Sequence, residues 1–212
     1  MSAIGAIVGS SLVSVSAGIT AKDREDLFDC LLRVDRLAGH VSREEHFAYW
    51  TYRYGTGMEQ RGCIKTGAIQ HQPTVINSAS ALKRITFDVT RFTGSTELAR
   101  QAIASLEVMQ LRGLAAQFFA NGSGQSDLAR FQMVPCLSGR SGQIVIMVCG
   151  IQLSGYADVR DYDFWTQTSR EMVLRISGGA YQFDREAYAQ HRERIKRELG
   201  DGARGAIHSF EL

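Results

Sequence analysis

The sequence predicts an α+β fold in which a single domain carries about four helices on a mostly antiparallel sheet. First, the chain of 212 residues is 44% hydrophobic and 22% charged, a balance typical of one globular domain. Second, helical and strand-like periodicities follow each other in blocks, without the regular strand and helix alternation of a parallel sheet. Third, no internal repeat is visible, so we expect residues 1–20 as an N-terminal segment and residues 21–212 as the domain.

The N-terminal segment is uncharged. Its first 21 residues contain no acidic or basic side chain and are rich in glycine and serine. These residues dilute the segment too much for a membrane-spanning helix, and no positive charge precedes them, as a secretory signal would require. A partial alternation over 12–19 is compatible with a buried strand. The glycines at 5 and 9 have the spacing of a close-packing G-x-x-x-G face.

Such a segment is unfavourable as a water-exposed surface, so its apolar side chains should be buried against other atoms. We expect it to pack against something outside its own fold: a protein partner, a second copy of the chain, or a membrane boundary. The candidate binding residues in it are Ile4, Ile7, Val8 and Leu12.

The first helix is expected over residues 20–37. Leu27, Leu31 and Val34 recur there at helical spacing, and Thr20 can cap the free backbone N–H groups. Acidic residues in its early turns favour the positive end of the helix dipole.

A second helix is expected from a capping box formed by Ser42 and Glu45. It should run to about Tyr54 and stop at the two following glycines. Phe47, Trp50 and Tyr54 share one helical face and should point into the core. The side chains that point elsewhere form a candidate exposed patch for a protein partner or lipid headgroups: Tyr49, Tyr52 and Arg53.

The middle and end of the chain are expected to alternate between sheet and helix. Residues 84–92 give the cleanest strand pattern, because apolar and polar side chains alternate there without exception from Ile85 to Thr90. The glycine-containing turn at 138–142 predicts a long hairpin whose second strand is apolar on both faces. The expected strands are 63–70, 84–92, 131–137, 143–153, 170–176 and 180–183, and the expected helices are 95–120 and 184–199.

Several function classes are excluded by what the chain lacks. Its net charge is +2, with basic and acidic residues interspersed, so no basic patch for nucleic acid is expected. The sequence has no P-loop, no dinucleotide-binding glycine motif, no G-x-S-x-G and no H-E-x-x-H. The four cysteines do not have zinc-site spacing. We therefore expect no cofactor and no metal.

One pair of residues suggests chemistry. If the chain turns back at 66–68, Cys63 falls opposite His71 on a hairpin. The flanking Arg61 and Lys65 would favour the reactive thiolate, with the imidazole as base. If the strand runs straight instead, about 26 Å separates the two residues. A cysteine-dependent acyl transferase or hydrolase is therefore one alternative function.

The leading hypothesis is a non-catalytic binding or assembly protein that uses the uncharged N-terminal segment, as a bacterial effector or a phage-type structural subunit would. Its partner would be another protein, a further copy in a homo-oligomer, or a membrane or lipid surface reached by residues 1–20. We expect it in the cytoplasm, or delivered from a bacterial cell without a cleaved signal peptide. Besides the thiol enzyme, the other alternative is a lipid or small-molecule carrier with a pocket between the aromatic helix and the sheet.

Overall fold

The computed structural model describes residues 3–43, 45–69, 71–111, 128–139, 141–155 and 172–212. Its centre is an eight-stranded sheet in the order β3-β7-β6-β5-β2-β1-β8, with β4 also paired to β7. The strands are β1 (Ile4–Val8), β2 (Ser11–Val15), β3 (Cys63–Ala68), β4 (Thr74–Ile76), β5 (Leu128–Ser138), β6 (Ile144–Gly155), β7 (Met172–Phe183) and β8 (Ile207–Glu211).

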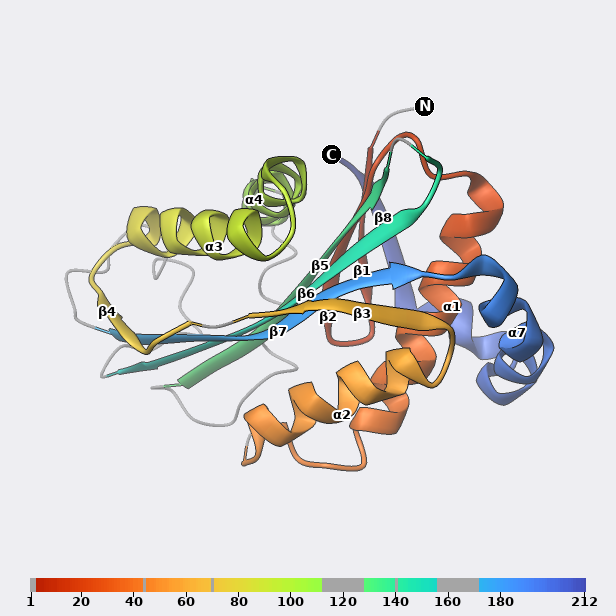
Figure 1. Ribbon diagram of the computed structural model, residues 1–212. Coiled ribbons are helices and arrows are strands. Elements are labelled where there is room, and N and C mark those ends of the chain that lie inside the picture. The colour runs from red at the N-terminus through yellow and green to blue at the C-terminus, as the bar shows by residue number, and fades with distance from the viewer. Residues whose placement is uncertain (1–2, 44, 70, 112–127, 140, 156–171) are drawn as a thin grey trace.

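Helices cover both faces of this sheet (Figure 1). The first layer consists of α1 (Ala21–Ala38), α2 (Phe47–Glu59) and α7 (Arg185–Leu199), and the second of α3 (Ala79–Thr93) and α4 (Thr96–Leu111). A short 3-10 helix, Asp201–Ala206, precedes β8. Side chains of β6 alternate between the two cores, with Val148 under the first layer and Met147 and Cys149 under the second. None of the described helices is both long and apolar enough to cross a membrane.

The α+β class is confirmed, but the sheet is mixed rather than mostly antiparallel. β2 and β5 pair in parallel, whereas the hairpin β5–β6 and its neighbour β7 are antiparallel as expected. A parallel pair needs a long crossover, and here the chain between β2 and β5 contains α1 to α4. The described residues form five helices instead of about four.

The structure corrects the expectation for the N-terminal segment, because it lies inside the fold. β1 pairs with β2 and β8, and β2 pairs with β5. Ala6 and Val8 pack in the core under α1, and Ile7 and Leu12 pack in the core on the opposite face. Ile7, Val8 and Leu12 are at most 8% exposed and Ile4 is half-buried, so helices of this same chain provide the cover.

Asp35 of α1 holds the turn between β1 and β2. Its carboxylate accepts hydrogen bonds from the hydroxyl and the backbone N–H of Ser10. Gly9 adopts a φ of 57°, and a Cβ there would lie 2.4 Å from an Asp35 oxygen. The uncharged composition of the segment is therefore that of two buried strands and a tight turn, not of a docking surface.

The expected strand at 84–92 is wrong, since these residues lie in α3. The buried side chains are Leu82, Thr86 and Thr90, each fully covered and spaced four apart, which is the spacing of a helix face. Ser78 caps the helix by accepting from the backbone N–H of Ala81. The apolar alternation misleads because the helix buries two threonines completely, while Ile85 and Val89 pack against the same core only partly buried.

Glycines also misled the expected ends of two elements. α2 continues through Gly55 and Gly57 to Glu59, because Gly57 lets Val34 of α1 approach closely. The two strands expected around Gly178 are one strand, β7, although Gly178 has a φ of 137°. A Cβ at Gly178 would lie 2.0 Å from the Val148 carbonyl oxygen, so this glycine permits close pairing with β6.

Several other expectations are confirmed. Thr20 caps α1 by accepting from the N–H of Asp23, and Asp184 caps α7. The N–H of Glu45 donates to the Ser42 hydroxyl, although α2 itself begins at Phe47. β8 was not expected from the sequence. The part of the expected helix 95–120 after residue 111 lies outside the described residues.

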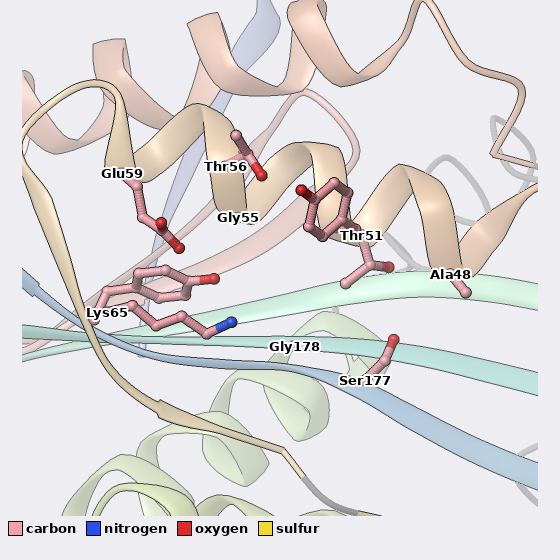
Figure 2. A pocket seen from close by; sticks show the side chains of 10 residues that line it. Ala48, Thr51, Gly55, Thr56, Glu59, Lys65, Ser177 and Gly178 are labelled. Atoms are coloured by element: carbon pink, nitrogen blue, oxygen red, sulfur yellow. The ribbon is translucent and has the colours of Figure 1, made fainter.

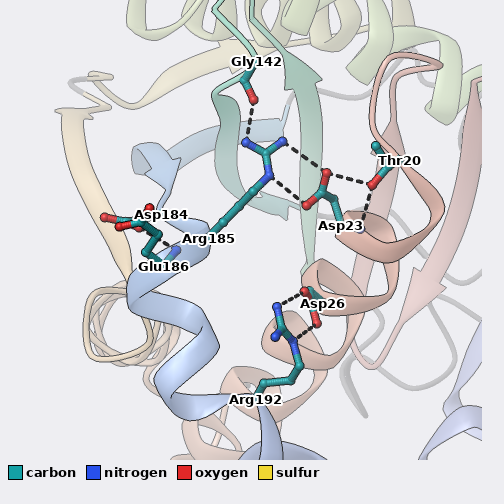
Figure 3. Close-up of polar contacts among 8 residues, drawn as sticks. All are labelled: Thr20, Asp23, Asp26, Gly142, Asp184, Arg185, Glu186 and Arg192. Atoms are coloured by element: carbon teal, nitrogen blue, oxygen red, sulfur yellow. Dashed lines mark hydrogen bonds and ion pairs between the residues drawn. The ribbon is translucent and has the colours of Figure 1, made fainter.

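The helix α7 is fixed to α1 by ion pairs (Figure 3). The Arg185 guanidinium donates to both carboxylate oxygens of Asp23, at 2.8 and 3.1 Å, and to the Gly142 carbonyl at 2.7 Å. The Arg192 guanidinium donates to both oxygens of Asp26, at 2.8 and 2.7 Å. Bidentate pairs of this kind fix orientation as well as distance. The charges of the C-terminal helix therefore dock it on α1.

Candidate functional site

A cavity of about 490 Å³ lies between α2 and the strands β3 and β7 (Figure 2). This volume is in the range of small-molecule sites, roughly 300 to 1,000 Å³. Its wall on α2 consists of Ala48, Thr51, Tyr52, Gly55, Thr56 and Glu59, and its wall on the sheet consists of Lys65, Ser177, Gly178 and Tyr181.

Gly55 allows α2 to approach β7 closely. A Cβ at this position would lie 2.5 Å from the Tyr181 hydroxyl oxygen, so the hydroxyl occupies the place where any larger residue would put its side chain. Tyr181 itself is only 3% exposed. The hydroxyl therefore sits at the inner end of the cavity, directly against the helix backbone.

Lys65 and Tyr181 are a cross-strand pair. They stand opposite each other where β3 pairs with β7, and paired side chains share a face with Cβ atoms about 5 Å apart. The Lys65 chain lies along the sheet, with its Cε 3.4 Å from where a Cβ on Gly179 would be. This glycine leaves room for the lysine stem, and the ammonium group is directed into the cavity (Figure 2).

Glu59 brings a negative charge to the same space. It lies at the end of α2 and is directed into the cavity from the side opposite Lys65 (Figure 2). Burial, and after it the charge of Glu59, raises the pKa of Tyr181 to about 12. The phenol therefore stays protonated at neutral pH and is available as a hydrogen-bond donor.

The aromatic side chains of α2 divide as expected. Phe47, Trp50 and Tyr54 are at most 6% exposed and form the core-facing stripe. Tyr49 and Tyr52 are 51% and 66% exposed, and their rings stack with centroids 6.2 Å apart. Tyr52 also lines the cavity, so the exposed pair lies at its edge, while the neighbouring Arg53 is half-buried.

The structure does not bring Cys63 and His71 together. β3 continues along β7 without turning back, with Cys63 opposite Phe183 and the Ile69 N–H donating to the Gly178 carbonyl. Because His71 follows Ile69 in the same direction, it lies on the order of 20 Å from Cys63. A hydrogen bond with Cys30, together with burial, raises the pKa of Cys63 well above that of a free thiol.

The neighbouring Arg61 does not lower the pKa of Cys63 enough to favour the thiolate. The coulombic effect of Arg61 on Cys63 is the smallest of the influences and is outweighed by burial. All four cysteines are buried free thiols. The Cys63 and His71 pair predicted as nucleophile and base is therefore wrong on geometry and on charge state. In the part of the chain that the structure describes, no group of three or more candidate ligands is placed to hold a metal ion.

The residues that give the cavity its polar character were not identified from the sequence as binding residues. The sequence predicts a role for Lys65 only beside the Cys63 thiolate, places Tyr181 in an expected strand, and gives no prediction for Glu59. One signal was present: in β3 the apolar Cys63 and the charged Lys65 alternate onto the same face. Cys63 is buried and Lys65 is exposed, so a charge on the face that carries a core residue indicates the solvated edge of that core.

No family model matches the chain, and no curated protein matches its sequence. Among solved structures, one titled "delta-endotoxin" superposes with a TM-score of 0.49 at 9% identity, covering 82% of this chain and 79% of the other. The activated Cyt2Ba monomer from Bacillus thuringiensis subsp. israelensis superposes with a TM-score of 0.46 at 10% identity, covering 82% and 96%. Because neither TM-score reaches 0.5, nothing about activity follows from these two likenesses.

Proposed function

We propose that this protein is a binding protein that holds a small amphipathic ligand in the cavity between α2 and the strands β3 and β7. The observation that carries the proposal is the Tyr181 hydroxyl, which lies against Gly55 inside a cavity of about 490 Å³. Among the described residues, none accepts a hydrogen bond from it. Because Tyr181 lines the cavity, its hydroxyl can donate to a ligand acceptor there.

The rest of the wall suits a ligand with both polar and apolar parts. Thr51, Thr56 and Ser177 offer hydroxyl groups, while the Tyr52 ring and the Ala48 methyl group offer apolar surface. Pockets that bind small molecules combine apolar walls with a few polar groups that set orientation. The alternative of a lipid or small-molecule carrier, which located a pocket between the aromatic helix and the sheet, thus agrees with the position of this cavity.

Native mass spectrometry of the purified protein tests the proposal. We expect a retained ligand, or saturable uptake of a fluorescent fatty-acid analogue, in the unmodified chain. Ala48→Trp fills the cavity from an exposed helix position and should abolish either signal. Ala189→Trp, at an exposed position on α7, is the matched control and should leave it intact. Equal uptake by both variants would refute binding in this cavity.

A second candidate function is contact with a lipid surface, favoured by the stacked Tyr49 and Tyr52 at the cavity edge. Tyrosine rings are amphipathic and favour the headgroup region of a bilayer. Tyr52→Ser should reduce flotation with phosphatidylcholine vesicles, whereas Phe92→Ser, which removes a 79% exposed ring from α3, should not. Equal flotation of the two variants would remove this candidate. A protein partner, a homo-oligomer and delivery from a bacterial cell stay predictions.

A further inference from the structure

Two opposite charges face the same cavity without neutralising each other. Lys65 enters from β3 and Glu59 from α2 (Figure 2). Both residues are exposed, and within the described part of the chain neither side chain forms an ion pair. Elsewhere the chain pairs its charges closely, as in Arg192 with Asp26 at 2.7 Å. Two solvated charges of opposite sign that face one cavity are positions where a ligand can replace water as the partner.

The lysine side of the cavity is equipped for an anion. Tyr181 stands beside Lys65 in the cross-strand pair and is 97% covered, with its hydroxyl free to donate. An ammonium and a phenol O–H are both donors, and hydrogen bonds from them to an anionic oxygen are of the strong, charge-assisted kind. An acceptor between them would complete both groups at once.

The glutamate side is equipped for a cation. A carboxylate accepts hydrogen bonds and attracts positive charge, and the ring of Tyr52 lines the same wall of α2. A simple anion bound at Lys65 would face the repulsion of Glu59, and a simple cation at Glu59 would face that of Lys65. A group that carries both charges avoids both penalties.

We propose that the ligand of this cavity presents a zwitterionic group, with its anion held by Lys65 and the Tyr181 hydroxyl and its cation held by Glu59. This inference rests on the proposed function of the same cavity. A phosphate joined to a quaternary ammonium is the group of this class that the experiment uses as probe. It occurs as a free small molecule and as the headgroup of a lipid, and both sources share the chemistry recognised here.

Isothermal titration of the full chain with phosphocholine tests the inference. We expect saturable binding of phosphocholine and at least tenfold weaker binding of inorganic phosphate or choline chloride, which each carry one half of the group. Vesicles of phosphatidylcholine and of phosphatidylglycerol then distinguish the sources. If the group belongs to a lipid, free phosphocholine should compete with the phosphatidylcholine vesicles. If it belongs to a free molecule, binding of phosphocholine should occur without vesicle binding.

Variants assign the two halves of the group. Lys65→Gln should weaken phosphocholine binding at least tenfold, and Tyr181→Phe should weaken it about tenfold. Glu59→Gln should reduce the preference for phosphocholine over inorganic phosphate. Lys22→Gln and Glu211→Gln change exposed charges outside the cavity and are the matched controls. Unchanged binding in Lys65→Gln or Glu59→Gln, or phosphate binding as tightly as phosphocholine, would overturn the inference.

The two proposals fail in different ways. If Ala48→Trp blocks ligand uptake but phosphocholine does not bind, the cavity is a binding site and its zwitterionic character is refuted. If Ala48→Trp changes neither uptake nor phosphocholine binding, the cavity is not the site and both proposals fall. Binding of phosphocholine that Ala48→Trp and Lys65→Gln both remove supports both proposals together.

Discussion

The two helical layers are held in place by different polar contacts. In the first layer, Arg185 and Arg192 of α7 form bidentate pairs with Asp23 and Asp26 of α1 (Figure 3). In the second layer, the ion pair of Lys83 with Glu107, at 3.0 Å, likewise joins helix to helix, α3 to α4. The first layer differs because charged groups also bond it to the sheet: the Asp35 carboxylate accepts from Ser10 in the turn between β1 and β2, and Arg185 donates to the Gly142 carbonyl.

The second layer does have polar contacts with the sheet, but they are few and uncharged. The Thr90 hydroxyl lies 3.5 Å from the Cys149 sulfur, and the Gln101 amide donates to the Cys136 carbonyl at 3.1 Å. Apolar packing therefore dominates the attachment of α3 and α4. Charge and pH should act on the first layer, whereas loss of apolar volume should affect both layers alike.

The largest expected effect tests the part that the layers share. Leu31 of α1 and Leu82 of α3 are both fully buried, one in each core. Leu31→Ala and Leu82→Ala should each lower the free energy of unfolding by about 2 to 5 kcal/mol, from lost burial and the cavity left behind. Urea unfolding followed by circular dichroism measures both.

An exposed aromatic residue provides the control for this pair. Phe92→Ala removes a ring that is 79% exposed on α3 and should change the free energy of unfolding little. A cost for Leu82→Ala as small as that for Phe92→Ala would show that the second layer is not part of the cooperative unit. In that case apolar packing would bind the two layers unequally.

A smaller effect should separate the layers. Asp26→Ala leaves the Arg192 guanidinium without its carboxylate, at a site where the Asp26 side chain is 6% and Arg192 22% exposed. Breaking such a mostly buried pair should cost about 2 to 3 kcal/mol. Lys83→Gln breaks the more exposed pair of the second layer and should cost about 1 kcal/mol or less. Similar costs in urea unfolding would contradict the difference between the layers.

How far the sequence predicted this fold depended on how local the signals were. The helices α1 and α7 could be predicted because Thr20 and Asp184 cap them from adjacent positions. The hairpin of β5 and β6 could be predicted from its glycine-containing turn. The strand at 84–92 could not be corrected from the sequence, since only the packed core shows that Thr86 and Thr90 are the buried side chains.

The candidate site was less predictable for the same reason. Its walls come from Glu59, Lys65 and Tyr181, and the last of these is far from the others along the chain. Their meeting depends on the long-range pairing of β3 with β7, which no local pattern indicates. The first 21 residues show a different difficulty. Their lack of charge is a local signal, but the sequence does not show whether another molecule or the same fold buries them.

The smallest expected effect concerns acid, and it should again appear in the first layer only. Hydrogen bonds from the Arg185 guanidinium hold the pKa of Asp23 below its usual value. A carboxyl with a lowered folded-state pKa stabilises the fold above its unfolded pKa, near 3.9, and loses that contribution as the pH falls through the folded-state pKa. Asp23→Asn should therefore flatten the loss of stability below about pH 4.

Asp35 should act in the opposite direction, which provides an internal comparison for the same titration. Burial raises its pKa, in spite of the hydrogen bonds from Ser10. Its favourable contribution is complete below the unfolded pKa and declines as the pH rises through the folded-state pKa. The measurement is the urea midpoint of unfolding between pH 3 and 7. Asp35→Asn should remove the decline as the pH rises. Asp88→Asn, on α3, should leave the fall of the midpoint at acid pH unchanged. If Asp88→Asn changes the fall of the midpoint at acid pH as much as Asp23→Asn does, charge stabilises both layers. That result would contradict the difference between the layers inferred from their polar contacts.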